Sequence, residues 1–153
     1  MGWDFLFGLT NAIALIGWLL LLLSSRGPKT MAVLLYGCVG ILCLAYLILF
    51  VVSFGGLVDP GLAAGTTAGG DFTSIEGIRS LLGSDGGIVI AWTHYLAFDL
   101  FVGIWIAKDA DHKGFTRLAQ VPFLASTLMA GPIGLFAWLI FRERRARALA
   151  RTA

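Results

Sequence analysis

The chain contains four long runs of apolar residues, separated by polar or glycine-rich segments. The runs cover residues 5–23, 31–53, 86–107 and 118–141, and each holds few charged side chains. A helix needs about 20 mostly apolar residues to cross a membrane hydrocarbon core that is about 30 Å thick. The pattern therefore predicts an all-α membrane protein, one domain over residues 1–153, with four transmembrane helices. Two of the three connections are short, so we expect an antiparallel bundle.

The connection over residues 54–85 is long, and its first part is an irregular glycine-rich segment. Its second part repeats apolar residues at helical spacing, namely Phe72, Ile75, Ile78 and Leu81. Thr73 and Glu76 fit a reciprocal capping box. We therefore expect a short amphipathic helix over about residues 73–82, lying on the membrane surface between the second and third spans.

Composition supports a membrane protein, because 58% of the residues are hydrophobic and 13% are charged. A typical soluble domain has about 25% charged residues. The net charge is +2, and residues 142–153 form a basic tail with Arg142, Arg144, Arg145, Arg147 and Arg151. Such a tail attracts anionic membrane lipids and is also typical of a cytoplasmic segment that follows a span. It has no interleaved aromatic residues, so we expect no nucleic-acid partner.

Four crossings place the N-terminus, the long connection and the tail on one side of the membrane. That side carries six Lys and Arg residues, against five in the two short connections. This difference does not decide the orientation under the positive-inside rule. We favour a cytoplasmic tail.

The spans contain few polar residues, and Asp99 is the least expected of them because it lies near the middle of the third span. An ionised aspartate there costs about 2.5–3.5 kcal/mol, so Asp99 must be protonated, paired or next to a wet cavity. Helical spacing puts Trp92 and Tyr95 on the face of Asp99, and Phe98 and Trp105 on the face of His94. His94 and Asp99 point about 140° apart, yet both can border one cavity.

Two interpretations of these residues fit the sequence. In the simpler one, Asp99 is a packing contact hydrogen-bonded by Asn11 or Thr127, worth about 0.6 kcal/mol, and His94 is satisfied by a carbonyl or water. In the functional one, His94 and Asp99 are candidate catalytic residues, an acid and a base. The candidate ligand-binding residues are then Asn11, Trp92, Tyr95, Phe98, Trp105, Thr127 and Pro132.

The fourth run contains Gly131-Pro132-Ile133-Gly134. Proline removes a backbone donor, and the glycines allow a kink or a close neighbour. The chain has no phosphate-binding loop, nucleophile elbow or dinucleotide fingerprint. Cys38 and Cys43 lie about 140° apart with no His nearby to complete a metal site. We expect neither a metal nor a cofactor.

The third span carries a family resemblance. Residues 92–109 read Trp-Thr-His-Tyr-Leu-Ala-Phe-Asp-Leu-Phe-Val-Gly-Ile-Trp-Ile-Ala-Lys-Asp. This stretch resembles the core motif of the abscisic-acid-deficient-4-like family, which are small neoxanthin-synthase-like membrane proteins. Residues 9–18, 73–82 and 127–134 support the resemblance, which covers nearly the whole chain. Ile104 departs from the basic or small residue often expected at its position.

The resemblance implies a four-helix membrane protein of xanthophyll metabolism, in which an epoxide is isomerised to an allenic alcohol. That reaction needs an acid at the epoxide oxygen and a base at the polyene, roles that the resemblance leaves to His94 and Asp99. The sequence shows no chloroplast transit segment, so we expect a bacterial member in the inner membrane.

Three functions follow as hypotheses. In the first, the protein binds, and as a cofactor-independent isomerase converts, a carotenoid or other isoprenoid in a groove between the third and fourth spans. In the second, it is a non-enzymatic subunit or assembly factor that packs against a larger membrane complex, or against its own copies, through the small residues Gly37, Gly40, Gly131 and Gly134. In the third, Asp99 serves a proton-coupled transporter, which would have to dimerise to enclose a path.

Overall fold

The computed structural model describes residues 2–62 and 70–150, so Gly65, Gly69 and Arg151 lie outside the described residues. All named elements are helices: α1 (Trp3–Leu23), α2 (Pro28–Ala32), the π-helical segment η1 (Val33–Val39), α3 (Gly40–Phe54), α4 (Ile75–Leu81), α5 (Asp85–His112) and α6 (Arg117–Ala150). In this described part, the pairing of Leu62 with Ser84 is an isolated bridge rather than a strand.

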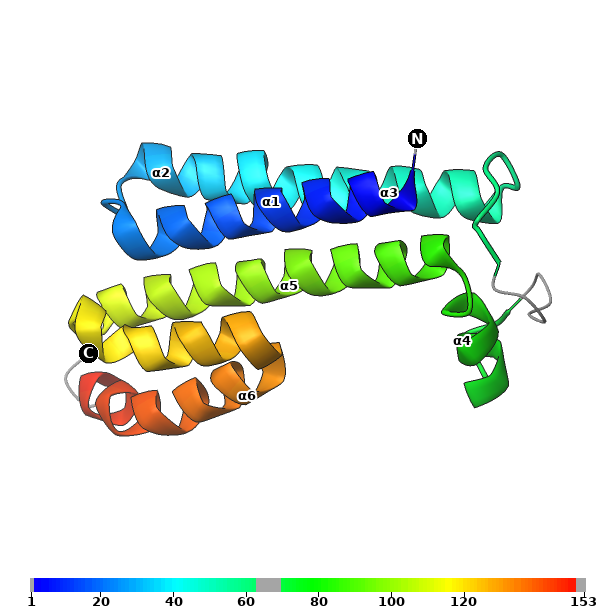
Figure 1. The fold of residues 1–153 in the computed structure, drawn as a ribbon. Coiled ribbons are helices and arrows are strands. Elements are labelled where there is room, and N and C mark those ends of the chain that lie inside the picture. The colour runs from blue at the N-terminus through cyan, green and yellow to red at the C-terminus, as the bar shows by residue number, and fades with distance from the viewer. Residues whose placement is uncertain (1, 63–69, 151–153) are drawn as a thin grey trace.

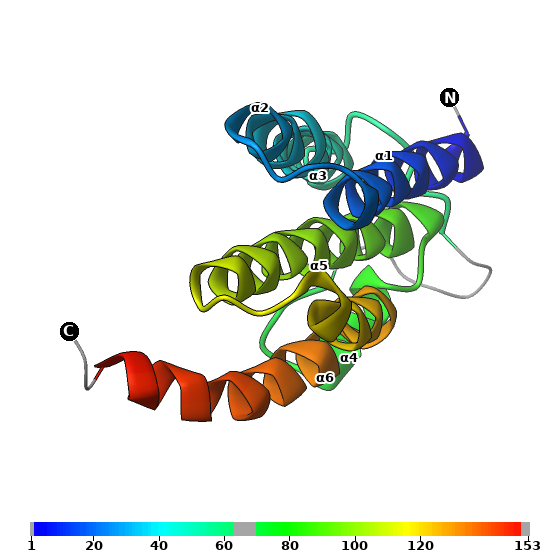
Figure 2. The same ribbon diagram turned by 90° about the vertical axis from the view of Figure 1, so that its left-hand side faces the viewer.

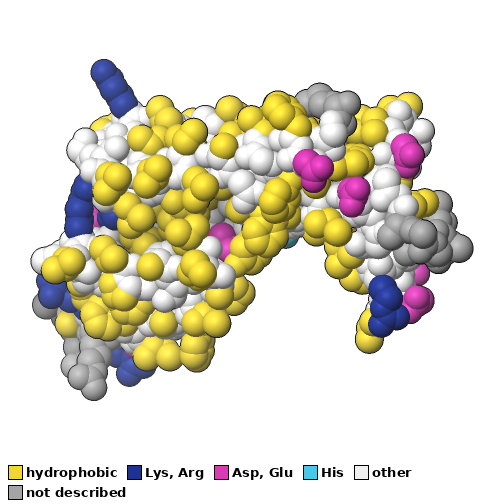
Figure 3. Space-filling view, viewed as in Figure 1, with side chains coloured by type: hydrophobic (Ala, Val, Ile, Leu, Met, Phe, Trp, Pro, Cys, Tyr) yellow, Lys and Arg dark blue, Asp and Glu magenta, His cyan; other side chains and the backbone are white. Residues whose placement is uncertain are grey.

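Four segments are long and apolar enough to cross a membrane, as the hydropathy pattern predicts. They are Trp3–Leu23, Pro28–Phe54, Asp85–His112 and Arg117–Ala148. The second of them is a single rod in which α2, η1 and α3 follow one another without a break in the chain. These helices are consistent with an integral membrane protein, and the large apolar side chains on their outer faces suit a lipid environment (Figure 3).

The helix α5 lies at the centre, with α1 and α3 along one side of it and α6 along the other (Figures 1 and 2). Close contact between α1 and α5 depends on two glycines. The Gly17 backbone faces Leu100, and Gly103 leaves room for the indole ring of Trp18. Trp18 is consequently buried at the core of the molecule. Small residues of this kind allow transmembrane helices to pack closely.

The helix α6 is broken at Ala130, whose φ of −158° and ψ of 79° are not helical. Its two halves fold back on each other, so that the end of α6 returns toward the loop that precedes it (Figure 1). The rings of Phe123 and Phe141, one from each half, lie 4.8 Å apart between centroids. The Gly-Pro sequence predicts a kink, and the structure shows a reversal of direction.

Two residues after the break explain why the chain can turn so sharply. Pro132 lies in the first turn of the second half, where its missing N–H would have no intrahelical partner in any case. A Cβ on Gly134 would overlap the Thr127 side chain and backbone. Glycine is therefore needed at position 134 for the two halves to approach.

The short helix α4 begins one residue later than a capping box at Thr73 requires. Its N-cap is Ser74, whose Oγ accepts the Gly77 backbone N–H at 2.9 Å. Thr73 instead donates to the carboxylate of Asp71 through both its backbone N–H and its hydroxyl. The capping box expected from Thr73 and Glu76 is thus wrong. The helix α4 lies beyond the start of α5 and runs across the direction of the long helices (Figure 1).

Candidate functional site

An apolar groove runs between α3 and α5, and we call it the α3–α5 groove. The hollow at the α4 end of this groove, which we call the upper hollow, has a volume of about 260 Å³. It is lined mainly by Tyr46, Phe50, Phe54, Phe72, Leu81, Leu82, Ile90 and His94. Two further hollows continue it along α5, and they are lined by Val39, Cys43, Tyr46, His94, Ala97, Phe98 and Phe101. The groove follows α5 from Gly87 to Phe101, which is about 21 Å at the helical rise of 1.5 Å per residue.

Aromatic rings form most of the wall of this groove. On α3, the Tyr46 and Phe50 ring centroids are 5.9 Å apart, and Phe50 stacks on Phe54 at 4.3 Å. On α5, the imidazole of His94 stacks on Phe98 at 4.5 Å and faces the Tyr46 ring at 5.6 Å. The polar groups of His94 and Tyr46 therefore lie at the middle of a groove wall that is otherwise apolar.

The end of the groove next to α4 is more polar than the rest of it. A hollow of about 280 Å³ adjoins the upper one there and includes Ser53 and Ser84. Ser84 accepts the Gly87 backbone N–H and so caps α5. The hydroxyl of Ser53 is buried and has no hydrogen-bond partner among the described residues. This end therefore carries hydroxyl groups, whereas the rest of the groove is lined mainly by apolar and aromatic side chains.

Asp99 lies on the other side of α5, against the break in α6. Its carboxyl faces the backbone N–H of Gly131 and the hydroxyl of Tyr95. The Tyr95 hydroxyl also donates to the Met129 carbonyl at 3.2 Å, an oxygen just before the break. Asp99 is buried, and an added Cβ at Gly131 would overlap its carboxyl. A carboxyl at the start of a half-helix is well placed to interact with that helix's dipole.

The structure therefore separates the two candidate catalytic residues. The hollows that His94 lines do not include Asp99. The simpler interpretation expected Asn11 or Thr127 to donate a hydrogen bond to Asp99. The structure shows neither bond, because each of these side chains donates to a backbone carbonyl instead. Asn11 donates to the Phe7 carbonyl at 2.7 Å, and Thr127 donates to the Phe123 carbonyl at 2.8 Å.

The remaining candidate ligand-binding residues fall into different places. Phe98 lines the α3–α5 groove. The Trp92 indole N–H donates to Asn11 at 3.1 Å and its ring stacks on Tyr95 at 5.3 Å, so these three join α1, α5 and α6. Trp105 lies under the guanidinium of Arg142, 5.4 Å from its ring centroid. Pro132 is exposed beside the break in α6.

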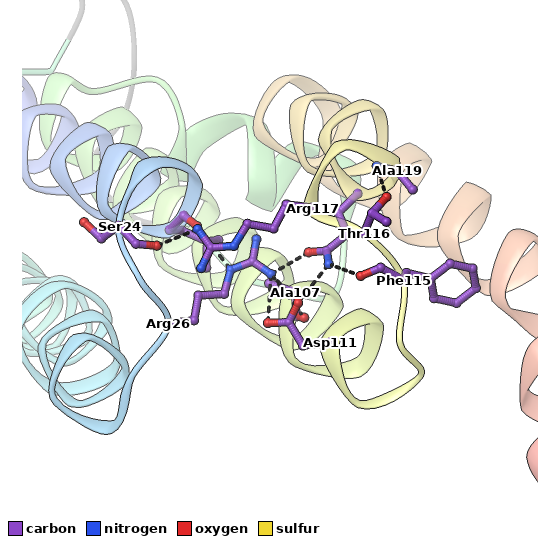
Figure 4. Close-up of polar contacts among 10 residues, drawn as sticks. Ser24, Arg26, Ala107, Asp111, Phe115, Thr116, Arg117 and Ala119 are labelled. Carbon is purple, nitrogen blue, oxygen red and sulfur yellow. Dashed lines mark hydrogen bonds and ion pairs between the residues drawn. The ribbon is translucent and has the colours of Figure 1, made fainter.

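A polar network at the opposite end of the long helices is absent from the sequence-based candidates. The Arg26 side chain is 5% exposed, and its guanidinium bridges Asp111 at 3.0 Å and donates to Gln120 and the Ala107 carbonyl (Figure 4). Arg117 donates to the Ser24 carbonyl at 2.8 Å. This network ties the turn after α1 to the end of α5 and the start of α6.

Sequence reasoning also missed most of the groove wall, although a signal was present. Tyr46, Phe50 and Phe54 repeat at intervals of four, which places them on one face of a helix. The same spacing is typical of ordinary packing, so it becomes informative only when the opposing face is known.

Comparison with known families gives one match. The model of the family described as ABA DEFICIENT 4-like matches residues 5–138, which is most of the chain. No curated protein and no solved structure matches the chain.

Proposed function

Because the chain belongs to the ABA DEFICIENT 4-like family, we propose that it binds a carotenoid or another long isoprenoid lipid in the α3–α5 groove. The observation that carries the proposal is the continuous wall of aromatic rings from Phe54 to Phe101. Long apolar ligands are held mainly by apolar and aromatic side chains, with few polar groups. The groove, which lies between the second and third spans, differs from the groove between the third and fourth spans expected from sequence.

The groove's shape suits a chain-like ligand better than a compact one. It extends for about 21 Å along α5 and joins neighbouring hollows, two of which share Tyr46 and His94 and two of which share Phe98. Ser53 at the end beneath α4 offers a hydroxyl for a polar end group.

The separation of His94 and Asp99 argues against their joint action on one bound chain. Isomerising an epoxide requires an acid and a base that reach the same ligand. In this arrangement His94 alone lies on the groove, and Asp99 contacts the break in α6. We therefore assign His94 to ligand contact and Asp99 to holding α6, and we propose binding as the activity.

The test is to purify the full chain in mild detergent from cells that make carotenoids, and to record its absorption spectrum and extracted lipids. We expect a bound pigment or isoprenoid at a fixed ratio to protein. Ala91→Trp fills the groove and should reduce that ratio several-fold. Ala12→Trp, on an exposed face of α1, is the matched control and should leave the ratio unchanged.

Two further variants divide the proposed roles. His94→Ala should lower ligand retention, because it removes the ring stacked on Phe98. Asp99→Asn should retain the ligand. A preparation that carries only phospholipid, or equal retention in Ala91→Trp and the wild type, would contradict the proposal.

A further inference from the structure

The break at Ala130 divides α6 into two halves, and the apolar part of each half is too short to cross a membrane, because charged residues follow from Arg142 onward. Residues 118–129 are about 18 Å long and residues 131–141 about 16 Å, at 1.5 Å per residue. Each length is about half of a hydrocarbon core of about 30 Å. Since the halves fold back at Ala130, the hairpin made by their apolar parts is about as deep as half of such a core. Backbone that breaks at membrane depth is tolerated where it is buried against protein, and Gly131 is buried against Asp99.

Contacts at the far end of α6 show where the tail returns. The Arg142 guanidinium lies 3.1 Å from the Asp109 carboxylate, and the Trp138 indole N–H donates to that same carboxylate at 3.1 Å. Arg145 donates to the Lys113 carbonyl at 2.8 Å. The second half of α6 therefore ends beside the loop from which its first half starts.

This return gathers the basic residues at one end of the molecule. Arg79, on α4, is the exception among the Lys and Arg side chains that the structure describes. The others are Arg26, Lys29, Lys108, Lys113, Arg117, Arg142, Arg145 and Arg147. Figure 3 shows Lys and Arg side chains at this end and most of the visible acidic side chains at the other.

Many of these basic side chains are exposed without a carboxylate partner. Asp109 pairs with Lys113 and Arg142, Asp111 with Arg26, and Glu143 with Arg147. Within the described part of the chain this leaves a set that we call the basic face, Lys29, Lys108, Arg117 and Arg145.

We propose that α6 enters and leaves the membrane at one side as a re-entrant hairpin, and that the basic face binds anionic lipid headgroups of the cytoplasmic leaflet. Basic side chains next to a membrane are attracted to anionic lipids, and an excess of them marks the cytoplasmic side. The chain then crosses the membrane at α1, at Pro28–Phe54 and at α5. The tail and both short connections are cytoplasmic, and α4 lies on the opposite side. This inference does not depend on the ligand of the α3–α5 groove.

The orientation is tested with reporters on the full chain in a bacterial host. A fluorescent protein that matures only in the cytoplasm should be bright at the C-terminus and dark at the N-terminus. Alkaline phosphatase, active only outside the cytoplasm, should give the reverse. Termini on the same side would overturn the hairpin, because four crossings require that result.

Cysteine labelling gives a second readout without a fusion. In a Cys38→Ala, Cys43→Ala background, Ala148→Cys should react with an impermeant maleimide in the same vesicles as Ser25→Cys. Labelling of Ala148→Cys together with Val58→Cys, in the long connection, would overturn the proposal.

The lipid contact is tested by reconstituting the full chain in nanodiscs of phosphatidylcholine, with or without phosphatidylglycerol. We expect the anionic lipid to raise the Tm by several degrees, and high salt to abolish the rise, because salt screens exposed charges. The Lys29→Gln, Lys108→Gln variant should lose most of the rise, and Arg79→Gln should keep it. An equal rise in all three proteins, or no rise in the wild type, would overturn the lipid contact.

Discussion

Gly134 lies where the two halves of α6 come closest. An added Cβ there would overlap Thr127 and come within 2.7 Å of the Phe123 carbonyl oxygen. Both neighbours belong to helical backbone or to a buried side chain, so neither can move away easily. The residue has a local role that its sequence context, a glycine after a proline, does not reveal.

We expect Gly134→Ala to lower the free energy of unfolding by about 1–3 kcal/mol, as overpacking of a closely packed core does. Thermal unfolding of the protein in detergent measures the change. Gly8→Ala is the matched control, since a Cβ there meets nothing within 4 Å, and it should cost nothing. Equal Tm values for Gly134→Ala and the wild type would show that the hairpin is open in solution.

Asp71 organises the start of α4 from outside the helix. Its carboxylate accepts the Thr73 backbone N–H and hydroxyl, each at 2.7 Å, and the Ser74 backbone N–H at 3.0 Å. The hydrogen bonds from Thr73, the side-chain one first, hold the pKa of Asp71 below its ordinary value of 3.8. The ionised form therefore supports the turn that leads into α4.

This lowered pKa predicts a loss of α4 structure in acid. The stabilisation is fully present above the ordinary pKa of 3.8 and is lost as the pH falls below it, through the lowered pKa of the folded state. Hydrogen-exchange protection of the α4 amides should fall in that window while protection of α5 remains. Asp71→Asn should remove the pH dependence. Unchanged α4 protection in acid would show that the turn does not need the charge.

At the level of elements, the sequence predicts the helices well and their arrangement poorly. Apolar runs such as residues 5–23 are long enough to predict a span from hydropathy alone. The reversal at Ala130 is not predictable in the same way, because a Gly-Pro pair is compatible with a gentle kink and with a hairpin. The hairpin depends on contacts that hydropathy does not report. Asp99 and Tyr95 of α5 contact the backbone at the break, and Thr127 of the first half packs against Gly134 of the second.

The candidate site shows the same limit. Helical spacing correctly predicts that His94 and Asp99 point in different directions, but it does not say which neighbouring helix each one meets. The structure places His94 against α3 and Asp99 against α6. The four-residue spacing of Tyr46, Phe50 and Phe54 does not by itself identify the groove wall, because a regular aromatic spacing is equally typical of core packing.

Across the whole molecule, the basic face and the proposed ligand groove lie toward opposite ends. The upper hollow of the α3–α5 groove lies next to α4. The basic face lies toward the other end of the molecule, on the start of α2, the last turns of α5 and the two ends of α6, where Figure 3 shows Lys and Arg side chains. If the basic face is cytoplasmic, the polar end of the groove near Ser53 lies at the outer leaflet. An isoprenoid with a polar end group would then be bound with that group facing outward.

Arg26 holds together elements that are far apart in the sequence. Its side chain is 5% exposed, and the guanidinium contacts Asp111, Gln120 and the Ala107 carbonyl (Figure 4). Asp111 is 41% exposed, so solvent screens part of the ion pair. Removing Arg26 destabilises the protein mainly because buried acceptors lose their donor, and each unsatisfied buried group costs about 1–3 kcal/mol.

We therefore expect Arg26→Leu to destabilise the protein by more than 1 kcal/mol, at about the cost of one buried unsatisfied group or above. Thermal unfolding in detergent measures this change, and limited proteolysis of the loop before α6 should accelerate with it, because Gln120 loses its guanidinium partner. Lys29→Leu, at an exposed position three residues later, should have no comparable effect. Arg26→Lys should recover only part of the loss, since an ammonium group cannot reach the same acceptors with a planar fork. Full recovery with lysine would show that charge alone, and not the shared hydrogen bonds, joins the turn after α1 to α5 and α6.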